Sequence, residues 1–202
     1  VKNVREFRLS CPSPDTNHYA DKPTFPVRLR YYSEDRINPA LALPKVSSQN
    51  RRYIPMEVID ADVIAGSKLF LIPDISLYHF GVLTSNVHMA WMRTVCGRLK
   101  SDYSYASNVV YNTFPWPEPT AQQRQKIEQT AQAILDARAL YPDSSLADLY
   151  DELTMPPELR KAHQQNDKAV MQAYGFSIRD TTESTCVAAL MKMYQQLIQA
   201  EK

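Results

Sequence analysis

Twelve residues, 97–108, carry the densest set of chemically useful side chains in this sequence. They supply two cations, one carboxylate, two phenols and several small hydroxyl or amide groups. Lys and Arg donate to the acceptors of guanine, a carboxylate accepts from the amino group of cytosine, and Ser bonds to either kind of edge. The segment therefore suits a surface that reads base edges, through Lys100, Ser101, Asp102 and Ser104. In an extended segment, Lys100 and Asp102 would project to the same side.

A second polar segment, residues 45–53, is better suited to phosphates. It brings Lys45, Ser47, Arg51 and Arg52 into nine residues, and cations and small hydroxyls are the groups that contact a phosphate backbone. The plainer alternative is that each segment is an ordinary polar loop with solvated charges. Composition by itself favours that alternative.

The residues of this sequence do not form a self-sufficient active site or metal site. The four histidines lack helical metal-binding spacing, and the three cysteines are too scattered for a zinc signature. Glycine occurs only four times, and neither a Gly-x-Ser-x-Gly elbow nor a Walker loop is present. Asn38-Pro39 is followed by Ala40, which fits a turn better than the Asn-Pro-Pro-aromatic motif of amino-group methyltransferases. The sequence therefore predicts no catalytic residue, no metal and no cofactor.

The composition is that of a globular protein. The 202 residues carry a formal net charge of +1, with 44% apolar and 22% charged residues, enough for one large domain or two small ones. Apolar runs fall short of a membrane span, no signal pattern is present, and three separated cysteines indicate reduced thiols. We expect a cytoplasmic chain without membrane contact. The first residue is Val, which favours a piece of a longer protein.

The chain changes character at residues 114–119, where three prolines alternate and no helix can continue. Beyond them the pattern is helical. Thr120 and Gln123 predict a capping box, residues 156–158 open another helix that ends near Gly175, and Thr181 or Thr182 starts the last one. In this last helix, six side chains are expected to face inward: Val187, Leu190, Met191, Tyr194, Leu197 and Ile198.

Before the prolines the pattern is mixed. Short runs at 27–32, 41–46, 68–72 and 108–111 predict strands, and Ser85 predicts the N-cap of a helix that reaches Gly97. Trp91 on this helix and Trp116 at the junction are expected to be largely buried. Charge is uneven, because residues 1–54 carry ten basic against five acidic side chains, whereas residues 119–202 carry nine against eleven.

Several motifs resemble a signature of the MmeI-like DNA methyltransferases. The most specific are Gly-Arg-Leu-Lys-Ser-Asp-Tyr-Ser-Tyr at 97–105 and Val-Tyr-Asn-Thr-Phe-Pro-Trp-Pro at 110–117. Further segments with the same resemblance follow one order along the chain, at 43–55, 77–85, 88–92, 140–143, 146–151 and 155–160. The similarity covers about residues 36–176.

In that family, one long chain joins an adenine methyltransferase domain, often an endonuclease, a target recognition domain and a C-terminal helical domain. The resemblance implies an N-terminally incomplete target recognition domain over 1–118 and a C-terminal helical domain over 119–202. S-adenosylmethionine and the catalytic motif would then belong to the upstream part of the parent chain. The segment after Gly-Arg-Leu would be a main specificity element and Lys68 would lie in a second, whereas Ser104 departs from the Arg common in relatives.

Together these features predict an α+β fold, with a mixed α/β target recognition domain followed by a small C-terminal helical bundle. The expected function is a DNA sequence-recognition module of an adenine-specific methyltransferase or bifunctional restriction–modification enzyme of phage defence. Its partners would be double-stranded DNA and the upstream methyltransferase domain. Arg93 and Arg98 would contact the DNA phosphates. The alternative is a protein-interaction or scaffold module without direct DNA contact. The recognised bases, the methylated strand and the presence of a nuclease stay open.

Overall fold

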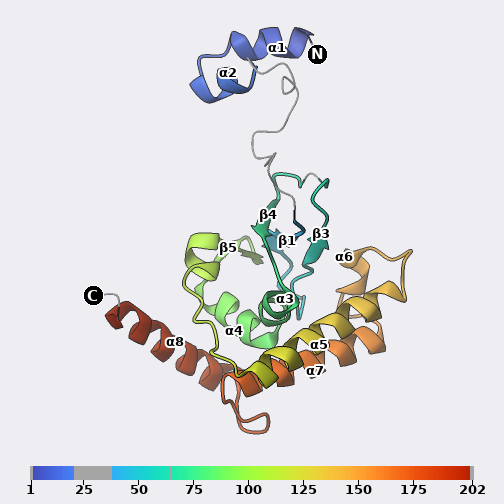
Figure 1. The fold of residues 1–202 in the computed structure, drawn as a ribbon, viewed down its shortest axis with the longest axis vertical. Helices are drawn as coiled ribbons and strands as arrows, with labels where there is room; N and C mark the ends of the chain where they lie inside the picture. Colours follow the sequence, from blue (N-terminus) through green and yellow to red (C-terminus); the bar gives the residue numbers. More distant parts are fainter. Residues whose placement is uncertain (1, 21–37, 64, 201–202) are drawn as a thin grey trace.

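The computed structural model describes residues 2–20, 38–63 and 65–200 (Figure 1). Its first elements are α1 (Lys2–Leu9) and α2 (Pro14–Ala20). The Nε of Arg5 donates to the carbonyl of Ala20 at 3.0 Å, which ties the two helices together. The strand predicted over residues 27–32 lies outside the described residues.

Two small antiparallel sheets follow, and of their six strands the sequence predicted only those within 41–46 and 68–72. The first sheet has the strand order β3 (Glu57–Ile59), β1 (Ala40–Pro44) and β4 (Leu69–Pro73). The second sheet has the order β2 (Val46–Ser47), β6 (Asp102–Ser104) and β5 (Gly97–Leu99). The predictions of strand at 41–46 and 68–72 are confirmed.

Lys45 is the backbone junction between the two sheets. It lies between β1 and β2, its N–H donates to the carbonyl of Lys68 at 2.9 Å, and its carbonyl accepts from the N–H of Tyr105 at 2.8 Å. Segments that are far apart in the sequence therefore meet at one residue. Because both backbone groups of Lys45 are bonded, the two sheets are fixed relative to each other at this point.

Two helices pack beneath the sheets, α3 (Leu77–Leu83) and α4 (Asn86–Val95). Each begins at a serine whose side chain accepts from the backbone three residues on, Ser76 from His79 and Ser85 from His88. The predicted N-cap at Ser85 is confirmed. The chain leaves α4 at Cys96 in an extended conformation, with φ −72° and ψ 154°.

The strand predicted at 108–111 is wrong. This segment belongs to the π-helix η1 (Ser107–Tyr111), closed by a bond from the N–H of Asn112 to the carbonyl of Ser107 at 2.9 Å. Val110 is buried and Val109 is 42% exposed, which is also the burial that a half-buried strand would give, so the side-chain pattern does not distinguish the two structures. The buried Trp91 donates from Nε1 to the carbonyl of Val110 at 3.1 Å and holds the turn in place.

The second half of the chain is helical, as predicted. Thr120 and Gln123 form the capping box at the start of α5, and Gly175 follows α7 with φ 71°, where a side chain would be strained. The elements are α5 (Ala121–Ala139), α6 (Leu146–Leu149), α7 (Pro157–Ala173) and α8 (Glu183–Ala200).

The inward face predicted for α8 is right only in its first half. Cys186 and Leu190 are buried, whereas Leu197 and Ile198 are 52% and 38% exposed. Figure 1 shows the reason, because the C-terminal part of α8 extends away from the other helices.

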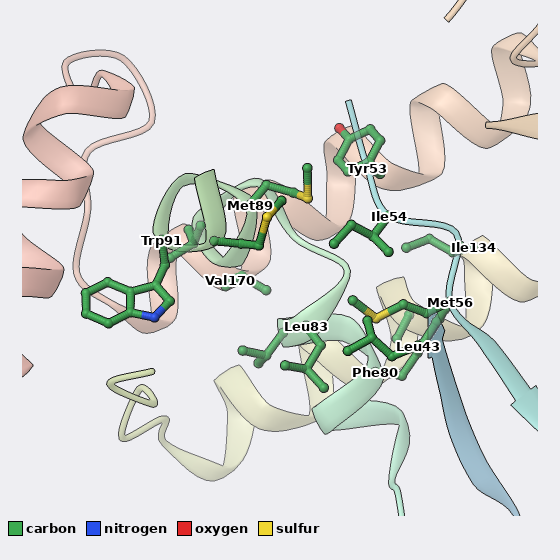
Figure 2. Close-up of a cluster of buried hydrophobic side chains, with 14 of the residues drawn as sticks. Leu43, Tyr53, Ile54, Met56, Phe80, Leu83, Met89, Trp91, Ile134 and Val170 are labelled. Atoms are coloured by element: carbon green, nitrogen blue, oxygen red, sulfur yellow. The ribbon is translucent and has the colours of Figure 1, made fainter. Parts of the chain in front are cut away.

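A single hydrophobic core joins the two halves. Figure 2 shows Leu43, Met56 and Phe80 from the first half beside Ile134 from α5, with Val170 from α7 in the same cluster. Buried polar contacts cross the same boundary, since the guanidinium of Arg138 on α5 donates to the carbonyl of Met56 at 2.8 Å. The proline-rich run at 114–119 therefore connects two parts that share one interior.

Helices α3 and α5 approach closely at Gly81. A Cβ at this position would lie 2.7 Å from the Cγ2 of Ile127, and Asn166 on α7 donates to the carbonyl of Gly81 at 2.7 Å. A larger residue would have to push α3 away from α5. The glycine is therefore required by packing, in the centre of the shared core.

The two tryptophans differ in burial. Trp91 is 1% exposed, as predicted, whereas Trp116 is partly buried and packs against the core. Its neighbour Phe114 fills the interior, 3% exposed, while Trp116 covers the surface of α3 with its ring centroid 5.5 Å from that of His79. Phe114 is therefore the aromatic residue that fills the interior at the junction between the two halves.

Candidate nucleic-acid interface

The sheet of β2, β6 and β5 presents one free face. Register pairs Ser47 with Tyr103, and both side chains are buried, at 3% and 7% exposure. Because side chains alternate along a strand, the neighbouring positions point to the opposite side. That outer face is formed by Val46, Leu99, Asp102 and Ser104, with Val46 opposite Ser104 and Leu99 opposite Asp102.

Lys100 and Ser101 form the two-residue turn between β5 and β6. Lys100 has φ 57°, in the left-handed region. The expectation that Lys100 and Asp102 project to one side of an extended segment is wrong, because Lys100 lies in the turn and only Asp102 lies in a strand. It is Ser104 that shares a strand face with Asp102.

One oxygen of Asp102 is bound within the protein. Its Oδ1 accepts from the N–H of Gln49 at 3.3 Å, and the hydroxyl of Tyr103 lies 3.5 Å from the carbonyl of Gln49. The hairpin thereby holds the loop that carries the predicted phosphate contacts. This contact joins Asp102, which is predicted to read bases, to the segment 45–53, which is predicted to contact phosphates.

Arg98 is held against the hairpin. Its Nη1 donates to the carbonyl of Ser101 at 3.1 Å, and its guanidinium lies 4.2 Å from the centroid of the Tyr103 ring. Both contacts leave the charge at the exposed edge of the sheet. Arg98 therefore braces the turn while keeping donors available to an anion.

Two lysines complete this side of the molecule. Lys68 is exposed just before β4, and the Nζ of Lys45 lies 4.8 Å over the ring of Phe70. Backbone pairing brings them together, because the N–H of Lys45 bonds to the carbonyl of Lys68. Eight of the predicted site residues thus gather from three segments around the second sheet, namely Lys45, Ser47, Lys68, Arg98, Lys100, Ser101, Asp102 and Ser104.

Ser47 is placed differently from the other seven. It is buried, so its hydroxyl faces the interior rather than a phosphate. Spacing alone could not separate an inward from an outward serine without the register of β2.

The remaining predicted cations form a second group. Arg93 on α4 is ion-paired with Glu183 at 3.1 Å and donates to the carbonyl of Arg52 at 3.3 Å. Arg52 and Arg93 line a cleft of about 440 Å³ together with Asn86 and Cys186. Arg51 is half-buried in the same loop as Arg52. The structure thus joins Arg93 to α8, a contact that the sequence did not indicate.

A buried carboxylate beneath this second group was missed by sequence reasoning. Asp167 on α7 accepts from the hydroxyl of Tyr53, the N–H of Asn86 and the side-chain amide of Asn86, each at 2.7 Å. Burial raises the pKa of the Asp167 carboxyl to about 6. Asp167 therefore connects the helical half to the loop of Arg51 and Arg52. The only signal was a carboxylate beside Asn166 on an otherwise apolar helix face.

Two further kinds of feature bear on the site, clustered metal ligands and helices that could span a membrane. Across residues 2–20, 38–63 and 65–200, no three His, Cys, Asp or Glu side chains are placed to hold a metal ion. No helix in that part of the chain is long and apolar enough to cross a membrane. His88 and His163 are buried within the core, where burial lowers the pKa of His88 to about 4.

Comparison with known proteins gives consistent matches over the whole chain. The family model of the MmeI target recognition domain matches residues 1–118, and that of the MmeI C-terminal domain matches residues 119–200. The DNA methyltransferase A of Bacillus subtilis (strain 168) is 39% identical over 165 residues, which are 82% of this chain and 18% of that protein.

A solved structure agrees with the sequence matches. The type IIL restriction-modification enzyme MmeI, in complex with DNA, superposes with a TM-score of 0.86 at 43% identity, over 98% of this chain and 26% of that enzyme. The α+β fold is thereby confirmed. The chain spans about a fifth to a quarter of the length of these relatives. The gathering of basic and polar side chains around the second sheet thus occurs in a chain that belongs to the MmeI family, with that family's target recognition and C-terminal domains.

Proposed function

We propose that this chain is the DNA sequence-recognition module of a larger adenine-specific methyltransferase or restriction–modification enzyme. The observation that carries the proposal is the neighbourhood of the second sheet, where side chains suited to base edges and phosphates come together from three segments of the chain. The methyltransferase and DNA complex among the relatives support the same substrate.

The outer face of β6 and its turn would read bases. Lys100, Ser101, Asp102 and Ser104 lie along this hairpin, with Lys68 close to its base. A two-stranded ribbon fits the major groove of duplex DNA, where each base pair presents a distinct pattern of donors and acceptors. Lys100 would donate to guanine, and Asp102 would accept from an amino group through its second oxygen.

The flanking cations would hold the phosphates. Lys45 lies beside the hairpin and Arg98 lies on its strand β5, while Arg51 and Arg52 lie in the loop that Asp102 tethers. Arg93 would contribute through its contact with the carbonyl of Arg52, while Glu183 offsets part of its charge. Ser47 is not among the proposed phosphate contacts, because it is buried and its hydroxyl faces inward.

Catalysis would belong to the upstream part of the parent chain. We assign residues 1–118 to target recognition and 119–202 to the C-terminal helical domain, which supports the reading face through the shared core. The parent would use S-adenosylmethionine, flip its target adenine and act on bacterial DNA in the cytoplasm. The free thiols of Cys11, Cys96 and Cys186 suit a reducing compartment.

A selection experiment tests the proposal. The isolated chain is incubated with duplexes that contain a randomised segment, and the bound fraction is sequenced after several rounds. Enrichment of one short motif, with affinity that falls as salt rises, is the expected result. If the bound pool stays random or nothing is retained, the chain is a scaffold module and the proposal is wrong.

A further inference from the structure

Two exposed apolar side chains lie among the proposed base readers. Leu99 is 58% exposed and Val46 is 38% exposed, and both belong to the outer face of the second sheet. Leu99 is the direct cross-strand partner of Asp102, and Val46 is that of Ser104. Directly opposite residues on one face lie about 5 Å apart, so any surface that meets Asp102 also meets Leu99.

Gly97 lies on the same face, at the edge of the sheet, and presents no side chain there. It is the cross-strand neighbour of Ser104, which in turn pairs with Val46. A Cβ at Gly97 would lie 3.9 Å from Ser104, an ordinary contact distance. Its φ is outside the left-handed region, and α4 already ends at Cys96, so neither packing nor backbone conformation requires glycine. A strand glycine without an internal reason is typical of a place where a ligand comes close.

The ligand that fits this face must offer an apolar group beside hydrogen-bonding groups. In the major groove of DNA, the C5-methyl group of thymine is the apolar group, and it adjoins the acceptors and donors of the neighbouring base edges. We infer that Leu99 contacts a thymine methyl group, so that the recognised sequence contains a thymine next to the base pair read by Asp102. This inference rests on the proposed function and adds a specificity-determining residue to it.

Deoxyuridine provides the test, because it differs from thymidine only by the missing methyl group. The recognised motif of the full-length parent is first determined by methylation-site sequencing. Duplexes with each thymine of that motif replaced singly by deoxyuridine are then compared for binding. We expect one position at which the replacement weakens binding about three- to fivefold, the effect of one buried methyl group.

The Leu99→Ala variant identifies the side chain responsible. It should bind the thymidine and deoxyuridine duplexes equally at that position, while its thermal stability stays unchanged because Leu99 is exposed. Leu153→Ala is the matched control, since Leu153 is 94% exposed and lies in the helical half. It should keep the full deoxyuridine effect.

Three outcomes overturn the inference. They are a recognised motif without thymine, equal binding of every deoxyuridine duplex by the unchanged enzyme, and a deoxyuridine effect that persists in Leu99→Ala. In each of these cases a specific motif is still read, so the recognition function survives. Absence of any motif overturns the function itself and the inference with it.

Discussion

Asp102 has one oxygen committed to the protein and one that faces outward with the sheet. Its Oδ1 accepts from the N–H of Gln49, while among the described residues no donor is placed against Oδ2. A side chain fixed by one contact loses less freedom when the other contact forms. At the scale of single residues, this position is therefore the best prepared to discriminate a base.

Replacing Asp102 with Asn or Lys should change the accepted base at one position of the recognised motif. An amide or amine at this site donates where the carboxylate only accepts, and the wrong base pair costs about 1–3 kcal/mol. Methylation-site sequencing of the full-length variants measures the change. Asp143→Asn, in an exposed turn of the helical half, is the control and should keep the parental motif. Full activity on the parental motif in both Asp102 variants would contradict base reading by this residue.

Replacing Arg51 with Ala should weaken binding to all sequences alike. A phosphate contact carries no sequence information, and its loss removes about one released counterion from the salt dependence. Binding of cognate and unrelated duplexes, measured over a range of salt concentrations, separates the two effects. Lys161→Ala, on the exposed side of α7, should leave the slope unchanged. A selective loss of cognate binding would instead make Arg51 a base reader.

At the scale of elements, the helix starts could be predicted because their signals are local. Ser85 and Thr120 act on backbone groups within three residues, whatever the rest of the chain does. The error at 108–111 has the opposite cause. A β-branched pair indicates a strand in isolation, but here the segment forms a π-helix whose Val110 carbonyl accepts a hydrogen bond from the indole of Trp91. Tertiary contacts of this kind cannot be read from neighbouring residues.

The candidate site was predictable in its composition and not in its arrangement. The polar segments 45–53 and 97–108 stand out by residue type, but the turn at Lys100 and Ser101 that makes a hairpin of the second segment was not predicted. The inward direction of Ser47 depends on pairing with β6, and the contact from Arg93 to Glu183 depends on where α8 begins. Both are set by long-range packing.

The two tryptophans should differ in their contribution to stability. Trp91→Ala should cost about 3–5 kcal/mol, because it removes a large side chain from a closed part of the core. Trp116→Ala should cost about 2 kcal/mol, since the partly buried ring loses mainly its aromatic contacts. Urea unfolding of both variants provides the comparison. A cost below about 1 kcal/mol for Trp116 would show that the junction does not need its aromatic cover.

At the scale of the molecule, residues 38–63 and 65–200 form one body with two sequence regions. Two features join the parts of the chain before and after the proline-rich run. One is the hydrophobic core that contains both Phe80 and Ile134, and the other is the set of three hydrogen bonds that Asp167 accepts from Tyr53 and Asn86. The helical half therefore sets the position of the loop that holds Arg51 and Arg52. Its contribution to recognition is indirect and passes through Tyr53 and Asn86.

The buried Asp167 carboxyl should make the free energy of unfolding depend on pH. Its pKa is raised to about 6 in the folded protein, so the folded state binds the proton more tightly than the unfolded state. The resulting stabilisation is complete below about pH 4 and is lost as the pH rises through 6. His88, with its pKa lowered to about 4, acts in the opposite direction, since its contribution is lost as the pH falls from about 6.5.

Comparing the protein with its Asp167→Asn variant isolates the carboxyl, because both carry His88. From pH 7 to pH 5, the free energy of unfolding should shift in favour of the unchanged protein by about 1 kcal/mol. Urea unfolding at pH 5, 6 and 7 measures this shift, with Asp143→Asn as the exposed control. A difference that stays constant over this range would mean that the buried carboxyl does not titrate there.

The left-handed φ of Lys100 has a consequence for how the specificity of the proposed recognition site could change. A side chain in this conformation costs about 1–2 kcal/mol relative to glycine, so the proposed base reader Lys100 destabilises its own turn. Glycine would make the turn more stable, and a lysine there is explained if its side chain contributes to binding. Because the two-residue turn is exposed, exchange of its side chains would alter the proposed base contacts without disturbing the core. Under the proposed function, new specificities would therefore arise in this module through a few substitutions at a position where glycine would be more stable.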